Sequence, residues 1–187
     1  MTKRDLPDNA RLIPAEATKV FEGVIHDVYQ WEQEMFDGSR KTYEMIKRPD
    51  TVLVVALDDD DKVVGMREEQ PNVPIRDARV PGGRVEPTDE STLAAAQREL
   101  FEETGLKMRE WKFAEVVQVE LKLEWFIHVF VARGIESEQK STPDAGGERI
   151  ELRRIPYEEL SMSNVDKSRV SFFRKVRTTE QLKALFD

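Results

Sequence analysis

The chain has 187 residues, of which 39% are hydrophobic and 35% are charged, and its formal net charge is −8. It contains no cysteine and only two histidines, which excludes disulfides and thiolate chemistry and argues against zinc sites built on paired histidines. No apolar stretch is long enough to span a membrane, and the acidic balance disfavours a broad nucleic-acid surface. We therefore expect a globular, cytoplasmic protein that binds neither membranes nor nucleic acids.

The first predicted element is a β-hairpin arm in residues 19–49. Apolar and aromatic residues alternate loosely there, and Asp37-Gly38 is a strong hairpin-turn signal. A second hairpin follows in residues 51–66, and residues 70–83, which are rich in Pro, Gly and Arg, are predicted to form a loop. We accordingly divide the chain into an N-terminal arm, residues 1–48, and a main domain, residues 49–187.

A helix is predicted after this loop, because Thr88 or Asp89 is a suitable N-cap and Gly105 is a suitable cap at the C-terminal end. The rest of the chain is predicted to form three strands, a helical turn and one or two closing helices, in residues 111–120, 125–134, 149–155, 156–160 and 165–187. This order predicts an α/β or α+β fold, in which helices pack against a mixed sheet.

The predicted helix carries three glutamates, Glu99, Glu102 and Glu103, within an arc of about 100° on one side. The ordinary interpretation is a solvated acidic face. These carboxylates, however, lie near the C-terminal end of the helix, where they oppose its dipole, and like charges at this spacing repel one another. A hard divalent cation such as Mg²⁺ resolves the repulsion, because it binds carboxylate oxygens and substrate phosphates together.

The stretch from Gly83 to Leu106 resembles the Nudix box, which is usually written G-x5-E-x7-R-E-U-x-E-E-x-G-U, with U a bulky apolar residue. Glu90 and residues 98–106 match the later fixed positions, whereas six residues rather than five separate Gly83 from Glu90. The resemblance implies a Nudix-type α/β/α sandwich with a mixed sheet. It also implies attack of water on a nucleoside diphosphate linked to another group, with Mg²⁺ as cofactor and Mn²⁺ as a substitute.

The resemblance further implies roles for single residues of the predicted helix. Glu99, Glu102 and Glu103 are similar to the metal ligands of the family. Arg98 is similar to the residue that orients Glu99, and Glu90 to the partner of Arg98 at the start of the helix. Arg98 and the three glutamates form the expected catalytic centre.

Two neighbouring loops are expected to complete this centre. Arg79, Gly82 and Gly83 lie in the turn before the helix and are predicted to contact the substrate, with Arg76 as an alternative to Arg79. The later loop "DAGGERIELRRI" resembles a segment that supplies one more acid to the site. Glu148 matches best, as a metal ligand or as the general base, and Asp144 and Glu151 are the alternatives.

The arm contains "KTYEMIKR", which resembles a segment of ADP-ribose pyrophosphatases. By that resemblance Tyr43 stacks on the base, Glu44 forms a hydrogen bond with it, and Arg48 contacts a phosphate. Tyr29 or Trp31 is a candidate for a second stacking face, although packing within the hairpin explains Trp31 equally well. In such enzymes the arm pairs with a second subunit, so a homodimer is implied.

The function implied is Mg²⁺-dependent hydrolysis of the diphosphate bond of a nucleoside diphosphate linked to a sugar. The first candidate is ADP-ribose, which would give AMP and ribose 5-phosphate. Other nucleoside diphosphate sugars, nucleoside triphosphates and a regulatory module that binds a nucleotide without cleaving it remain as alternatives. The two histidines, His26 and His128, are predicted to have structural roles.

Overall fold

The computed structural model describes residues 5–140, 149–165 and 170–187. Within these ranges the chain forms nine strands and four helices: β1 Thr18–Phe21, β2 Asp27–Glu34, β3 Arg40–Lys47, β4 Thr51–Leu57, β5 Val63–Glu69, β6 Arg76–Arg79, α1 Thr92–Thr104, β7 Leu106–Glu120, β8 Leu123–Glu138, β9 Arg149–Ile155, α2 Tyr157–Val165, α3 Phe172–Lys175 and α4 Thr179–Lys183. Among the described helices, none has the length and apolar character that crossing a bilayer requires.

The long strand β8 organises the sheet. Strand β7 runs antiparallel along one edge of β8, while β4 and the end of β3 both pair with the other edge in parallel. Strand β4 is paired with β5 at Leu57 and Val63, next to the turn that joins them, and β5 then pairs with β6 and β9. The sheet is therefore mixed, and its two halves separate beyond the β4–β5 turn.

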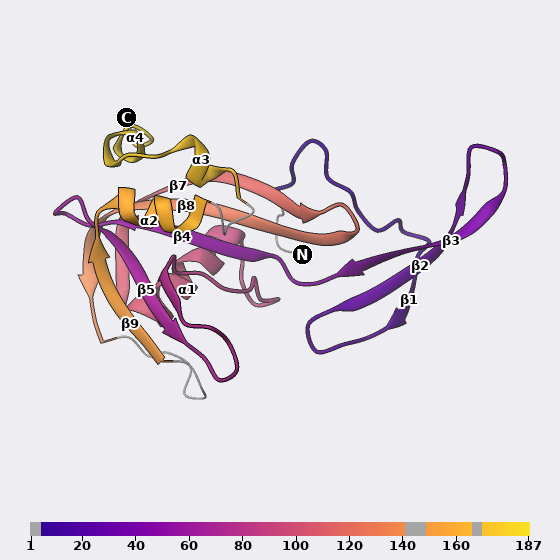
Figure 1. Cartoon of the computed structure of the whole chain (residues 1–187), viewed down its shortest axis with the longest axis horizontal. Helices are drawn as coiled ribbons and strands as arrows, with labels where there is room; N and C mark the ends of the chain where they lie inside the picture. Colours follow the sequence, from indigo (N-terminus) through magenta and orange to yellow (C-terminus); the bar gives the residue numbers. More distant parts are fainter. Residues whose placement is uncertain (1–4, 141–148, 166–169) are drawn as a thin grey trace.

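Alternating residues of β4 and β8 supply two hydrophobic cores, one on each face of the sheet. Val52 and Val54 pack with Leu100 of α1 on one face. Val55 packs with Tyr157 of α2 on the other face, in a core that α3 and α4 also enter. Helices thus cover both faces (Figure 1), and the predicted α/β/α sandwich is confirmed.

The arm consists of β1, β2 and β3, and it projects from the sandwich in Figure 1. Strands β2 and β3 form the predicted hairpin, and Gly38 adopts the positive φ, 80°, that its turn requires. The segment before β1 is tied to the main sheet, because the backbone N–H of Ile13 donates to the carboxylate of Glu124 at 2.7 Å. The proposed boundary between residues 48 and 49 stays a prediction.

Three details differ from the sequence-based expectations. The range 70–83 is not all loop, because β6 lies within it and pairs with β5. The N-cap of α1 is Ser91, whose Oγ accepts from the N–H of Ala94 at 3.0 Å, rather than Thr88 or Asp89. Strands β7 and β8 are longer than predicted, since β7 begins directly after Gly105.

Candidate active site

The turn before α1 brings bare backbone against a carboxylate. Gly82 has φ 151°, and a Cβ on it would overlap the carbonyl oxygen of Val52. A Cβ on Gly83 would overlap the carboxylate of Glu99. The turn is held in this place by the N–H of Val52, which donates to the Gly83 carbonyl at 2.9 Å. Both glycines are therefore required by the close approach of the turn to β4 and α1.

Arg98 holds the first two glutamates of the motif. Its Nη1 donates to Glu99 at 2.9 Å and to Glu102 at 3.1 Å. On its other side Nε and Nη2 each donate to the carboxylate of Asp89 at 2.9 Å, and this hydrogen bonding lowers the pKa of Asp89. The guanidinium thus links the start of the helix to two of the predicted metal ligands.

The partner of Arg98 is therefore Asp89, and the expectation that Glu90 has this place is wrong. Asp89 is buried, whereas Glu90 is exposed. Five residues, 84–88, separate Gly83 from Asp89, so the additional residue of the motif lies between Asp89 and Arg98 and not in the turn. Because Asp89 binds Arg98 and the N–H of Glu86, Ser91 caps the helix instead.

Glu103 has the least exposed side chain of the three glutamates. Its carboxylate accepts from the N–H of Gly82 at 2.7 Å and lies 3.8 Å from Nη1 of Arg79. Burial nevertheless raises the pKa of Glu103 to about 7, and burial also raises the pKa of Glu99. The groups around Glu99 and Glu103 therefore do not fully offset the free-energy cost of burying their ionised carboxylates.

Arg79 connects the turn to a buried acid that the sequence-based reasoning missed. It donates to the carbonyl oxygen of Gly82 at 3.0 Å and forms an ion pair with Glu68 of β5, whose side chain is fully buried. Arg76 pairs with the same carboxylate. No signal in the sequence marks Glu68, because its burial depends on the pairing of β5 with β6.

The donor groups fit a hard divalent cation. Within the described ranges no three acidic or histidine side chains already converge on one point, since Arg98 draws Glu99 and Glu102 together and Gly82 holds Glu103. Carboxylate oxygens are nevertheless the ligands that Mg²⁺ prefers. Burial raises the pKa values of Glu99 and Glu103 because it disfavours their ionised forms, and a bound cation would stabilise those forms.

The acid expected from the later loop is not placed. Glu148 and Asp144 lie outside the described residues. Glu151 lies on β9 opposite Arg67, and its carboxylate is 3.4 Å from Nε of Arg153. The assignment of the general base stays a prediction.

The aromatic residues of the arm fall into two separate cavities. Tyr43 and Trp31 form a tilted pair with ring centroids 5.1 Å apart, and both line a groove of about 640 Å³ between the arm and the N-terminal segment. Lys122 lies over the Tyr43 ring at 5.2 Å. Glu44 accepts from Gln30 at 2.7 Å, and as a strand neighbour of Tyr43 it points to the opposite face.

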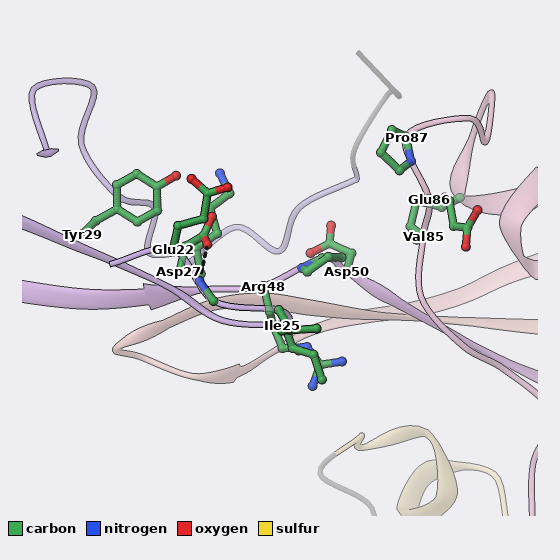
Figure 2. A pocket seen from close by; sticks show the side chains of 14 residues that line it. Glu22, Ile25, Asp27, Tyr29, Arg48, Asp50, Val85, Glu86 and Pro87 are labelled. Atoms are coloured by element: carbon green, nitrogen blue, oxygen red, sulfur yellow. Dashed lines mark hydrogen bonds between the residues drawn. The ribbon is translucent and has the colours of Figure 1, made fainter. Parts of the chain in front are cut away.

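The second cavity, of about 460 Å³, lies between the arm and the turn before α1. Figure 2 shows its labelled walls, with Tyr29 and Arg48 on the side of the arm and Glu86 on the side of the turn. Asp50, between these walls, accepts from the N–H of Phe126 and lies 3.3 Å from Nε2 of the buried His128. The structure therefore brings Arg48 together with Tyr29, not with Tyr43.

Comparison with known proteins adds three findings. The NUDIX domain model matches residues 47–176. The chain is 24% identical over 144 residues to the ADP-ribose pyrophosphatase of Bacillus subtilis strain 168, and 23% identical over 143 residues to the methanol dehydrogenase activator of Bacillus methanolicus. Each of these matches covers 75% of this chain and 76% of the relative.

A solved structure has the same fold. The crystal structure of an ADP compounds hydrolase superposes with a TM-score of 0.63 and covers 98% of this chain and 96% of its own. Its sequence identity is 19%, so the similarity concerns the fold.

Proposed function

Because the chain belongs to the NUDIX family, as its glutamate motif predicts, we propose that it hydrolyses the diphosphate bond of a nucleoside diphosphate linked to a sugar. The family match, the Bacillus subtilis relative and the solved structure confirm the predicted enzyme class, a pyrophosphohydrolase. The observation that carries the proposal is the turn–helix unit, residues 81–104, in which Arg98 and Gly82 hold three carboxylates beside bare backbone.

The residues of this unit have distinct proposed roles. Glu99, Glu102 and Glu103 would hold Mg²⁺, or Mn²⁺ in its place, and such an ion supplies charge neutralisation on the phosphates and a lower pKa for a bound water. Arg98 orients Glu99 and Glu102 through its hydrogen bonds. The glycines let the turn pack directly against β4 and against the carboxylate of Glu99.

ADP-ribose is the proposed substrate, with AMP and ribose 5-phosphate as products. The names of the Bacillus subtilis relative, an ADP-ribose pyrophosphatase, and of the solved structure, an ADP compounds hydrolase, support an ADP-linked compound. The aromatic pair of Tyr43 and Trp31 is suited to stacking on a base. Glu44 points to the opposite face of β3, so it cannot accept a hydrogen bond from the same base within one chain. Arg48 and Arg79 are proposed to bind phosphate.

We propose that the enzyme is a cytoplasmic homodimer that pairs through its arm. Several large apolar side chains of the arm are exposed in the single chain, namely Val20, Phe21, Val24, Ile25 and Phe36, and surfaces of this kind mark sites of association. A second arm packed on them would also lie near the groove that contains Tyr43. Sedimentation velocity should give the mass of two chains.

A substrate screen tests the proposed function. The protein is incubated with Mg²⁺ and with ADP-ribose, other nucleoside diphosphate sugars or nucleoside triphosphates, and the products are identified by mass. We expect AMP and ribose 5-phosphate from ADP-ribose, and no product after Mg²⁺ is chelated. Nucleotide binding without any cleavage in the presence of Mg²⁺ would contradict the proposal and favour a regulatory module.

A further inference from the structure

Glu68 of β5 is a buried acid that lies apart from the three glutamates of α1. Its two carboxylate oxygens are divided between two arginines of β6, because Oε1 binds Arg76 and Oε2 binds Arg79. The side chain of Glu68 has no exposed surface, whereas the side chains of Arg76 and Arg79 are 46% and 25% exposed. The desolvation cost of a buried ion pair often equals or exceeds the attraction between its charges. Stability alone therefore gives little reason for a glutamate in this place.

A β-bulge places both arginines on the same face as Glu68. Met66 is opposite Arg79 and Glu68 is opposite Arg76, so two steps along β5 correspond to three steps along β6. Without the additional residue, positions 76 and 79 would project to opposite faces of β6. The bulge contains Ala78, whose φ of 54° costs a non-glycine residue free energy. The strained backbone thus directs Arg79 toward Glu68, and bulges beside active sites commonly redirect a side chain in this way.

Helix α2 holds the bulge in place. The side-chain amide of Asn164 donates to the carbonyl oxygen of Ala78 at 2.8 Å. Ala78 itself is buried in the hydrophobic core that contains Tyr157 of α2. The direction of the Arg79 side chain is therefore fixed by the fold as well as by Glu68.

Arg79 lies between Glu68 and one carboxylate of the proposed metal site. Its Nη1 binds Glu68 and is 3.8 Å from Oε1 of Glu103, a distance that is too long for a hydrogen bond. Its Nη2 donates to the carbonyl oxygen of Gly82 at 3.0 Å. Glu103 accepts from the N–H of Gly82 with its other oxygen, Oε2, at 2.7 Å. Because an ionised carboxylate has about four lone-pair sites, Glu103 can still bind a cation in this arrangement.

We propose that Glu68 is a positioning residue of the metal site and that it acts through Arg79. By binding Nη1 of Arg79, Glu68 keeps this guanidinium from closing on Glu103, so the Glu103 carboxylate stays available for a divalent cation. Without Glu68, Arg79 would move the short distance to Glu103 and form a charge-assisted hydrogen bond that competes with the cation. This inference rests on the proposed function, because it concerns a metal ligand that the function requires.

Binding of Mn²⁺ to the protein without substrate tests this assignment independently of turnover. Electron paramagnetic resonance measures the free ion during titration of the wild type, Glu68→Gln, Glu69→Gln and the double variant Glu68→Gln/Arg79→Gln. Glu69 is the next residue of β5, is 44% exposed and points to the opposite face, so its variant matches the change in charge. The double variant removes both members of the ion pair and keeps the net charge of the wild type.

The double variant separates a positioning role from a merely structural one. Glu68→Gln should weaken Mn²⁺ binding about tenfold or more, the size of effect that removal of a residue supporting a metal ligand has, and Glu69→Gln less than about threefold. The double variant should bind Mn²⁺ within about threefold of the wild type, because no guanidinium at position 79 then competes for Glu103. A structural role predicts that the double variant binds no better than Glu68→Gln. That result, or equal affinities of Glu68→Gln and Glu69→Gln, would overturn the assignment.

Arg79→Gln tests the assignment even where Glu68→Gln does not fold. Glu68 keeps its ion pair with Arg76 in this variant, and the competing guanidinium is absent. Mn²⁺ should therefore bind at least as tightly as it binds the wild type. Binding about tenfold weaker than in the wild type would contradict the assignment.

The two proposals fail in different ways. If Mn²⁺ affinity depends on Glu68 and Arg79 as expected but no nucleotide sugar is cleaved, the proposed function fails while the role of Glu68 stands. If ADP-ribose is cleaved and Mn²⁺ affinity is the same in all variants, the role of Glu68 fails while the proposed function stands. A wild type that binds no Mn²⁺ would overturn both the metal site and the role of Glu68.

Discussion

The turn–helix unit and the arm present their functional side chains in opposite ways. In the turn–helix unit Arg98 donates to three carboxylates and Gly82 donates to Glu103, so the carboxylates are already oriented within one chain. In the arm Tyr43 is 38% exposed and Phe36 is fully exposed. The difference supports our proposal that the reaction centre is built by a single chain, whereas the proposed base-binding region is completed by a second chain.

The largest expected effect tests the turn–helix side of this comparison. Glu103→Gln removes a charge that the proposed metal site needs, and it should lower kcat about 100- to 1000-fold while the protein stays folded. Glu90→Gln, in the same stretch but exposed, is the matched control and should keep at least half of the activity. Steady-state kinetics and circular dichroism measure both properties. Equal activities of the two variants would contradict the assignment.

The pKa of Glu103 gives the second prediction. Because burial raises this pKa to about 7, the folded metal-free protein binds this proton more tightly than the unfolded chain. The resulting stability is fully present below about pH 4.5 and is lost as the pH rises through about 7, by at most about 3 kcal/mol.

Denaturant unfolding at pH 5 and pH 8 measures this loss. The free energy of unfolding of the metal-free wild type should decrease between these values relative to that of Glu103→Gln, which cannot ionise. Parallel pH profiles of the two proteins would show that the Glu103 carboxylate is not desolvated.

A smaller effect tests which residue anchors Arg98. Asp89→Asn weakens a charge-assisted pair and should reduce the free energy of unfolding by about 2 kcal/mol. Glu90→Gln should change it by less than about 0.5 kcal/mol. Chemical denaturation gives both values, and the opposite ranking would restore Glu90 as the partner of Arg98.

The smallest expected effect concerns the arm. Tyr43→Ala should raise KM for ADP-ribose about tenfold, because stacking on a base contributes about 1–3 kcal/mol, and it should hardly change KM for a base-free sugar diphosphate. Initial-rate kinetics with both substrates measure the contrast. An equal change for both substrates would remove Tyr43 from the base-binding site.

The sequence predicted those parts of the fold that depend on local patterns. The Asp37-Gly38 hairpin, the α1 helix ending at Gly105, and the two long strands all follow from turn chemistry and hydrophobic periodicity. Strand β6 was missed because Pro, Gly and Arg dominate its surroundings, and it forms only by pairing with β5.

The candidate site shows the same limit. The three glutamates are marked by their spacing on one side of a helix, and Arg98 is marked by the resemblance to the Nudix box. The role of Asp89 was misassigned to its neighbour, since a one-residue insertion cannot be located by counting until the hydrogen bonds of Arg98 are known. The ion pair of Glu68 with Arg79 and the hydrogen bond of Trp125 with Thr51 arise from contacts between strands that are distant in the sequence.

The most direct test of the central claim is anomalous scattering from crystals soaked in Mn²⁺. If the carboxylates of α1 are the metal site, a manganese peak should lie against Glu99 and Glu103 in the wild type and should be absent in Glu103→Gln. An active wild-type enzyme whose crystals bind manganese elsewhere, with nothing at these carboxylates, would contradict the account.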